Sequence, residues 1–410
     1  MEGYNKKVIM SYWTICRMKT TKKIYVKVSI IFLLGGILLF SSCEKEENQK
    51  IEANRKTLFM YLPWSSNLTN YFYNNISDLE KCITKIGLNN EKVIVFISTG
   101  STEAMMFEIV SSHGRCKREI LKKYKSPPFT TIDGITAILN DVKAFAPASV
   151  YTMIIGCHGM GWLPVYEMKV RSAPHMHWEY QGVPLTRYFG GLTAEYQTDI
   201  KSLASGIANA GMKMEYILFD DCYMSSIEVA YELKDVTKYL IGSTSEMMAY
   251  GMPYAAIGEY LLGNPDYQSG CEEFYNFYST YEIMPCGTLA VTDCSELENM
   301  AAIIKSINSK YSFDKSLRGT IQRLDGYTPV IFYDFADYIT SLCNDPILLN
   351  QFREQLNHLV PYKTHTKNFY TMAKGIIPIN TFSGITTSDP SDNPMTVLKE
   401  NTLWYKAAHN

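Results

Sequence analysis

Short apolar runs alternate with amphipathic segments from residue 57 to about residue 265. The runs contain few polar positions, as expected for strands that are buried on both faces of a parallel sheet. They occupy residues 57–62, 92–98, 149–156, 214–219 and 239–243, with a shorter run at 105–110. The segments with apolar residues at helical spacing occupy residues 77–86, 131–145, 200–210 and 225–233. This alternation predicts an α/β fold, with a mostly parallel sheet flanked by helices.

The pattern changes after about residue 265, where helical spacing dominates. Residues 271–281, 296–311 and 353–359 are the expected helices of this half. We therefore expect an α/β domain at residues 56–265 and a mostly helical C-terminal subdomain at residues 266–410.

The first 43 residues have the order of an export signal. Four lysines between positions 19 and 27 precede an apolar run at 28–40, and two serines and Cys43 follow it. The apolar run has thirteen residues, fewer than the roughly 20 that span a bilayer. The order resembles a bacterial lipoprotein signal peptide, with Cys43 as the lipidated residue and Met18 as a candidate true start. The alternative is a single N-terminal membrane anchor.

Polar and charged residues follow this signal. Residues 44–55 have the composition of a tether, and the acidic residues at its start resemble the surface-export signal of Bacteroidetes lipoproteins. The sequence therefore predicts an exported protein that a lipid holds at the outer membrane, facing the cell surface.

Composition narrows the class of protein. Hydrophobic residues make up 46% of the chain and charged residues 20%, which is typical of a globular protein with a sizeable core. The net charge of −2 gives no electrostatic reason to expect a nucleic-acid partner. The ten cysteines form no C-x-x-C pair, so neither a zinc knuckle nor a thioredoxin-type motif is supported. We expect several of them to behave as small buried hydrophobic residues.

Two of the predicted strands end at reactive side chains. The strand at 149–156 leads to His158 and Gly159, and the strand at 214–219 leads to Asp220, Asp221 and Cys222. Chemistry in open α/β sheets lies at the carboxyl ends of the strands, and a thiol nucleophile needs a nearby base.

The spacing of these residues predicts a catalytic pair. His158 and Cys222 would lie at the ends of neighbouring strands, with Cys222 at the start of a helix whose dipole favours the thiolate. The backbone N–H groups of Gly159 and Cys222 would form an oxyanion hole. The alternative is that Cys222 is a buried structural thiol and His158 a hydrogen-bonded core histidine.

The residues between these strands have no clean periodicity. The irregular segment at 165–197 carries Lys169, Arg171 and Arg187. A long irregular segment inside a compact α/β domain is usually functional or mobile.

Several short motifs together resemble the clostripain family of cysteine peptidases. The resemblance covers residues 57–254 and, more loosely, the C-terminal Trp404-Tyr405-Lys406. The motifs are His158-Gly159, Gly161-Trp162, Asp220-Asp221-Cys222, Glu228, residues 243–246 and residues 251–254. The resemblance implies a caspase-like fold, a Cys–His dyad, endopeptidase cleavage after Arg or Lys, and self-cleavage between the histidine and the cysteine. Peptides or proteins would be the substrates.

The family's site residues carry over by position. His158 is then the base, Cys222 the nucleophile, and Asp220 the carboxylate that lines the pocket for a basic side chain, with Ser245 and Glu246 also at the substrate. Members that cut after Arg or Lys generally have a second acidic residue in the following loop, but residues 247–252 contain none. Either Glu246 substitutes for it or the pocket accepts another side chain. Lys169, Arg171 and Arg187 remain three open candidates for the self-cleavage site.

Other groups of polar residues give weaker signals of a functional site. His175 and His177 alternate without nearby cysteines or carboxylates, so we expect no metal site there. Asp389, Asp392 and Asn393 could bind calcium, but a turn explains them as well, and we expect no cofactor. Two rival functions stay open: a catalytically silent surface-binding protein on the same fold, and a peptidase that does not prefer basic residues.

Overall fold

The computed structural model describes residues 54–165, 180, 182–188 and 196–409. The predicted signal peptide with Cys43, most of the predicted tether, Lys169, Arg171 and the His175/His177 pair lie outside these residues. No helix among the described residues is long and apolar enough to cross a membrane.

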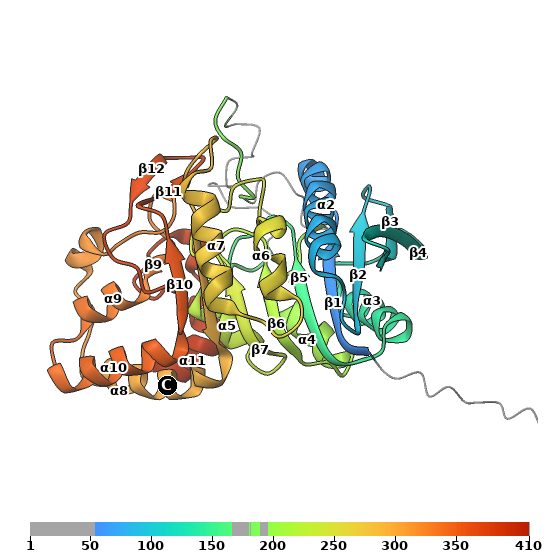
Figure 1. The fold of residues 1–410 in the computed structure, drawn as a ribbon. Coiled ribbons are helices and arrows are strands. Elements are labelled where there is room, and N and C mark those ends of the chain that lie inside the picture. The colour runs from blue at the N-terminus through green and yellow to red at the C-terminus, as the bar shows by residue number, and fades with distance from the viewer. Residues whose placement is uncertain (1–53, 166–179, 181, 189–195, 410) are drawn as a thin grey trace, which may run out of the picture. The chain divides into compact units, whose positions relative to one another are not determined.

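A sheet of nine strands runs through the molecule in the order β10-β8-β7-β6-β5-β1-β2-β3-β4 (Figure 1). The five strands from β7 to β2 pair in parallel, and the outer pairs on both sides are antiparallel. The predicted fold, α/β with a mostly parallel sheet, is therefore confirmed. The strands are β1 (Asn54–Leu62), β2 (Glu91–Ser98), β3 (Glu103–Ser112), β4 (Arg115–Lys125), β5 (Ala148–Ile155), β6 (Met214–Phe219), β7 (Thr237–Gly242), β8 (Thr288–Asp293) and β10 (Tyr362–His365).

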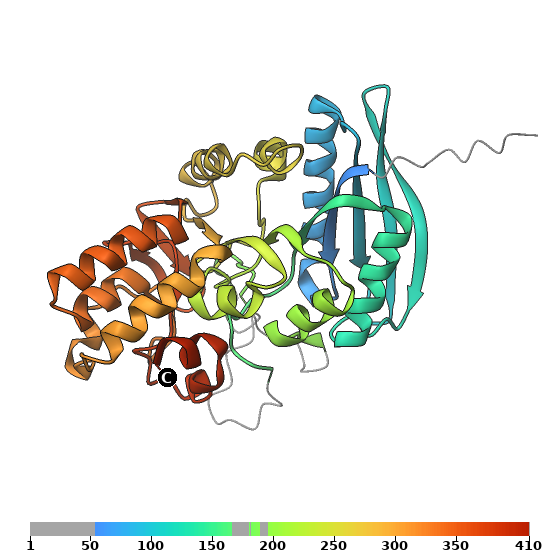
Figure 2. The ribbon, with the colours of Figure 1, turned by 90° about the horizontal axis from the view of Figure 1, so that it is seen from below.

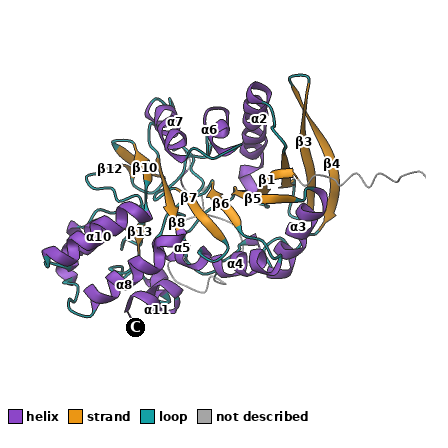
Figure 3. Ribbon diagram, turned by 60° about the horizontal axis from the view of Figure 1, so that its bottom comes forward, coloured by secondary structure: helices purple, strands orange, loops and turns teal. Residues whose placement is uncertain are grey.

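Helices cover both faces of this sheet (Figure 3). One layer holds α2 (Thr69–Ile86), α6 (Tyr254–Leu261) and α7 (Tyr267–Ser279). The other holds α3 (Ile132–Phe145), α4 (Ile200–Asn209) and α5 (Ile227–Leu233). Because both faces are covered, the central strands are buried along most of their length, as their apolar sequences predict.

Local sequence sets where several of these helices begin. The Thr131 side chain accepts a hydrogen bond from Gly134 N at the start of α3, and the Asp199 side chain accepts one from Ser202 N at the start of α4. Such caps satisfy backbone N–H groups that the first helical turn leaves unpaired.

Strand β4, like β8 and β10, was not expected from the sequence. β4 forms an antiparallel hairpin with β3 at the edge of the sheet, beside α3 (Figure 2). Its sequence is mostly charged, and its residues are exposed or half-buried. Arg118 of this strand forms an ion pair with Glu80 of α2 at 2.6 Å. An edge strand needs little apolar surface, so a search for apolar runs misses it.

The C-terminal half contributes helices and two strands of the central sheet, β8 and β10. The predicted boundary at residue 265 stays a prediction. The helices are α8 (Leu297–Asn308), α9 (Phe335–Leu342), α10 (Pro346–Leu359) and α11 (Leu403–His409). Two small sheets pair β11 (Asn368–Thr371) with β12 (Gly375–Pro378) and β9 (Tyr333–Asp334) with β13 (Thr386–Thr387). Trp404 of α11 is fully buried against Phe335 and Tyr231.

Candidate active site

The two predicted reactive loops meet at one edge of the sheet. β5 and β6 pair in parallel, with Ile155 opposite Phe219, so the loops that follow them lie side by side. Gly159 packs directly on the second loop: a Cβ atom there would lie 2.3 Å from the Cys222 carbonyl oxygen and 2.8 Å from Cys222 N. A side chain at residue 159 would push the two loops apart, so glycine is required here.

The His158 imidazole is fixed by a residue that the sequence did not single out. Its Nε2 atom lies 2.9 Å from Oδ1 of Asn67, next to the short 3₁₀ helix Ser66–Leu68. Because Oδ1 is an acceptor, this bond requires a proton on Nε2. Nδ1 is then the basic nitrogen of the neutral ring.

Cys222 does not lie at a helix start, so that part of the sequence analysis is wrong. α5 begins at Ile227 behind the Ser226 cap, and Tyr223, with φ of 64°, turns the chain between the thiol and the helix. The Cys222 Sγ atom accepts a hydrogen bond from Met247 N at 3.1 Å. Burial raises the pKa of the Cys222 thiol well above its usual value, with smaller contributions from nearby carboxylates.

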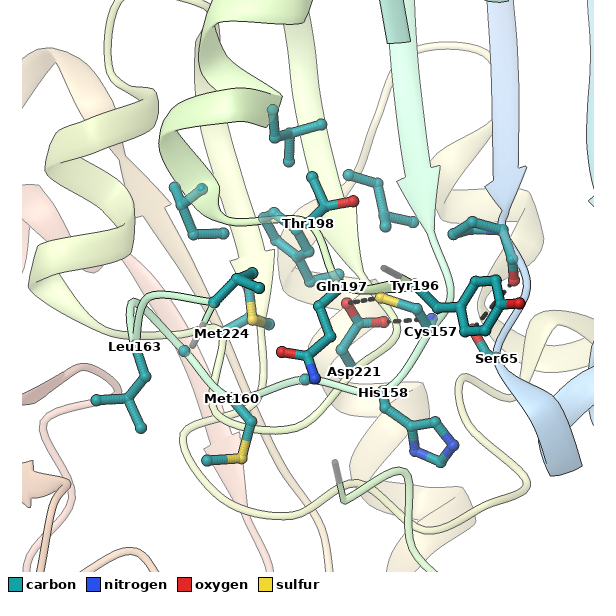
Figure 4. Close-up of a pocket in the computed structure, with 18 of the residues that line it drawn as sticks. Ser65, Cys157, His158, Met160, Leu163, Tyr196, Gln197, Thr198, Asp221 and Met224 are labelled. Carbon is teal, nitrogen blue, oxygen red and sulfur yellow. Dashed lines mark hydrogen bonds between the residues drawn. The ribbon is translucent and has the colours of Figure 1, made fainter. Parts of the chain in front are cut away.

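Asp221 joins the two loops through hydrogen bonds with Cys157, not with Cys222. Its carboxylate accepts hydrogen bonds from Cys157 N at 2.9 Å and Cys157 Sγ at 3.1 Å. This pair and His158 are among the residues that line a pocket (Figure 4), whose volume is about 130 Å³. Burial raises the pKa of Asp221 to about 7.

The pocket beside Asp220 is filled by the chain's own Arg187, whose side chain is fully buried. Its Nη1 atom lies 2.9 Å from Asp220 Oδ2 and donates to Asp220 O at 2.7 Å. Nη2 donates to Asn75 Oδ1 at 2.6 Å and to Tyr250 O at 3.2 Å, and Nε donates to Ala249 O at 3.3 Å. The guanidinium therefore makes four hydrogen bonds and one ion pair in this pocket.

The walls of this pocket are shaped for that guanidinium. Gly251 has a φ of 78°, and a Cβ atom there would lie 2.1 Å from Arg187 Nη2. Asp220 is held by Met252 N and the Tyr254 hydroxyl, both at 2.8 Å. Burial raises the pKa of Asp220, and the Arg187 charge opposes that shift. A buried carboxylate that is so fully hydrogen-bonded needs a cationic partner.

The backbone around Arg187 pairs antiparallel with residues 247–249 through an isolated bridge between Thr186 and Met248. Arg187 N donates to Met247 O at 2.7 Å, and Ala249 N donates to Leu185 O at 2.9 Å. The Arg187 carbonyl oxygen accepts a hydrogen bond from Gly159 N at 3.3 Å. Gly159 N–H, predicted as an oxyanion-hole donor, thus contacts the carbonyl of the residue whose side chain fills the pocket.

Two further residues were predicted at the substrate. Glu246 accepts a hydrogen bond from the Thr186 hydroxyl at 2.6 Å, next to Arg187 but not on its guanidinium. The Ser245 hydroxyl is buried and lies 3.1 Å from Thr288 Oγ1, away from Arg187. The second side chain that contacts the guanidinium is the amide of Asn75, which comes from α2 and not from the loop at residues 247–252.

Calcium has no evident site in the described part of the chain. No group of three or more histidines, cysteines or carboxylates there could hold a metal ion. Asp392 instead pairs with Arg318 at 2.5 Å, and Asn393 caps the 3₁₀ helix Pro394–Thr396. The turn interpretation therefore accounts for these residues. The eight cysteines from Cys82 to Cys343 are free thiols.

Comparisons with known proteins give one family and several similar structures. The model of the clostripain family, peptidase C11, matches residues 60–376. A secreted C11 cysteine protease from Bacteroides thetaiotaomicron, "iotapain", is 58% identical with a TM-score of 0.81, over 87% of this chain and 99% of that chain. A clostripain from Bacteroides thetaiotaomicron ATCC 29148, in complex with the peptide inhibitor BTN-VLTK-AOMK, is 65% identical with a TM-score of 0.53, over 54% of this chain and 99% of that chain.

A more distant structure is similar over the same length. An inactive zymogen C11 protease from Parabacteroides distasonis is 25% identical with a TM-score of 0.72, over 87% of this chain and 99% of that chain. No curated protein matches the chain.

Proposed function

The chain belongs to the clostripain family of cysteine peptidases, and from that premise we propose an endopeptidase that cuts after arginine and first cuts itself after Arg187. Cys222 is the nucleophile and His158 the base. The observation that carries the proposal is the pose of Arg187, with its side chain in the Asp220 pocket and its carbonyl oxygen on Gly159 N.

This pose has the parts of a bound substrate. Residues 185–187 pair antiparallel with the backbone of residues 247–249, and main-chain pairing of this kind is a common way for proteins to hold a peptide. The charged side chain is matched in its pocket, and the carbonyl is presented to a backbone N–H. The inhibitor of the relative from Bacteroides thetaiotaomicron contains Leu-Thr-Lys in the letters VLTK, and here the matching residues are Leu185, Thr186 and Arg187. The similarity supports Arg187–Tyr188 as the bond that is cut.

The chemistry follows from these positions. His158 takes the thiol proton, Cys222 Sγ attacks the Arg187 carbonyl carbon, and the N–H groups of Gly159 and Cys222 stabilise the negative charge on its oxygen. The C–N bond breaks as His158 gives its proton to the Tyr188 amine, and water then hydrolyses the thioester.

The uncut chain is latent because its own arginine fills the pocket. A peptide cannot bind beside Asp220 until the segment around Arg187 leaves. Cutting the Arg187–Tyr188 bond frees that segment, so self-processing and activation are the same event. Lys169 and Arg171, the other two candidates, lie outside the described residues.

Export completes the proposal. A relative from Bacteroides thetaiotaomicron is described as secreted, and the N-terminal sequence has the order of a lipoprotein signal. We place the enzyme at the outer membrane, held by a lipid on Cys43, where its substrates are peptides and proteins outside the cell.

Arg187→Gln tests the cleavage site. We expect the wild-type chain to yield a fragment that begins at Tyr188, and the variant to leave that bond intact, because Gln lacks the charge that Asp220 binds. Mass spectrometry of the purified protein identifies the fragments. Arg115→Gln, on the exposed hairpin, is the matched control and keeps the cut. Cleavage at the 187–188 bond in the variant would contradict the proposal.

The replacement Asn75→Asp tests whether the pocket prefers arginine or lysine as the last substrate residue before the cut. The guanidinium makes four hydrogen bonds and an ion pair in the pocket, whereas an ammonium has only three donors, so we expect arginine peptides to be cut much faster than lysine peptides. A carboxylate at residue 75 attracts the lysine ammonium, so the Arg/Lys ratio of kcat/KM should fall about tenfold.

The measurement is kcat/KM of processed enzyme on two reporters that differ only in the last residue. Asn89→Asp, which adds the same charge at an exposed loop, should leave the ratio unchanged. An unchanged Arg/Lys ratio of kcat/KM in Asn75→Asp would show that Asn75 does not distinguish the arginine side chain of the substrate from that of lysine.

A further inference from the structure

The residue before Arg187 is as deeply buried as Arg187 itself. Thr186 has 1% of its surface exposed, and its hydroxyl donates to Glu246 Oε2 at 2.6 Å. The same hydroxyl oxygen accepts a hydrogen bond from Tyr188 N at 3.2 Å. Leu185, the next residue toward the N-terminus, is exposed. The substrate-like segment therefore places two consecutive side chains, those of Thr186 and Arg187, inside the protein.

Glu246 is held rigidly in position to meet that hydroxyl. Its Oε1 atom accepts from the Tyr223 hydroxyl at 3.0 Å, and its Oε2 atom accepts from Met372 N at 3.0 Å. The Thr186 hydroxyl is the third donor to the same carboxylate. Tyr223 follows the nucleophile directly, and Met372 follows β11, so the site is assembled from two separate parts of the chain.

We infer that Glu246, with Tyr223 and Met372, forms a subsite that selects a hydroxyl-bearing residue, threonine or serine, immediately before the arginine of the substrate. The inference rests on the proposed function, because it takes Arg187 to mark the cut. It assigns Glu246 a role in specificity that is separate from the arginine pocket.

Chemistry explains the selectivity. A valine has almost the shape of threonine but places a methyl group against the buried carboxylate, which then loses one of its three donors. Sites built to hydrogen-bond a substrate hydroxyl reject analogues that lack it more strongly than apolar pockets reject a missing methylene. A lysine does not fit in the pose of the threonine, because a 2.6 Å contact already joins that short side chain to Oε2.

The surroundings of Glu246 allow a substrate to reach it after processing. It lines a cavity of about 450 Å³ together with Tyr188, Tyr223, Tyr327 and Lys374. Tyr188 is the first residue after the proposed cut, so its departure enlarges the space beside Glu246. The carboxylate would then face solvent until a peptide brings its own hydroxyl.

Four reporter peptides test the inference on the processed enzyme. They have the sequence Val-Leu-X-Arg, with Thr, Ser, Val or Lys at X. We expect kcat/KM for Thr and Ser to exceed that for Val by about 10- to 100-fold, and Lys to be the poorest. In Glu246→Gln the amide must turn its NH2 toward one of the donors, so the Thr/Val ratio should fall to near one. Glu119→Gln, on the exposed β4 strand, is the matched control and keeps the wild-type ratio.

The outcomes separate this inference from the proposed function. Equal rates for Thr and Val, or the fastest rate for Lys, would overturn the subsite while leaving cleavage after arginine intact. Failure to cut any of the four arginine peptides would instead overturn the proposed function. If Glu246→Gln does not fold, the wild-type Thr/Val ratio still decides.

Discussion

Replacing Cys222 with alanine is expected to lower kcat on arginine-ended peptides by at least about 10⁴-fold, which is the size of the loss in kcat when the nucleophile of a peptidase is removed. Without the sulfur no thioester forms, and the remaining backbone donors act only on bound water. The same replacement should stop the cut after Arg187, so the purified variant stays a single uncut chain. Reporter turnover and denaturing gel electrophoresis measure the two effects.

Cys116→Ala provides the matched control for that experiment. Cys116 lies on β4 at the far edge of the sheet and also has a free thiol. We expect its removal to leave both the turnover and the cut at Arg187 unchanged. Full activity in Cys222→Ala would overturn the catalytic assignment. A cut that persists while turnover is lost would show that another protease makes it.

The strand ends could be predicted because their signals are local. β6 has the predicted bounds, and β5 agrees to within a residue at each end. Parallel strands that are covered on both faces leave apolar runs that end abruptly. His158 and Cys222 follow two such runs, so their approach required only that β5 and β6 be neighbours.

The rest of the site depends on contacts that the sequence does not reveal. Asn75 lies on an amphipathic helix more than a hundred positions from Asp220, and nothing in its neighbourhood marks it as a pocket residue. The choice of Arg187 among three basic residues needed the pocket itself. The error at Cys222 arose because the turn through Tyr223 delays the helix, and a positive φ at a tyrosine is not a local sequence signal.

Replacing Asp220 with asparagine is expected to destabilise the uncut chain by about 3–5 kcal/mol, the cost of leaving one partner of a buried ion pair alone. The other partner is Arg187, which would stay buried with its charge only partly balanced. The measurement is chemical denaturation in the Cys222→Ala background, where the chain cannot cut itself. Asp392→Asn removes an exposed ion pair with Arg318 and should cost about 1 kcal/mol or less.

A double replacement then measures the interaction between Arg187 and Asp220 apart from the contacts that each makes with other residues. Arg187→Met in the Asp220→Asn chain removes the unpaired charge while keeping an apolar stem, so it should recover much of the lost stability. If the two replacements were simply additive, Arg187 and Asp220 would not be coupled in solution. The pose of Arg187 would then not be that of a bound substrate, and its carbonyl would not be held at Gly159 for attack. Strong coupling between Arg187 and Asp220 would show that the Asp220 carboxylate holds the blocking arginine in the uncut chain. If the Asp220→Asn replacement also abolishes cleavage after arginine by the processed enzyme, the same carboxylate binds the arginine of the substrate.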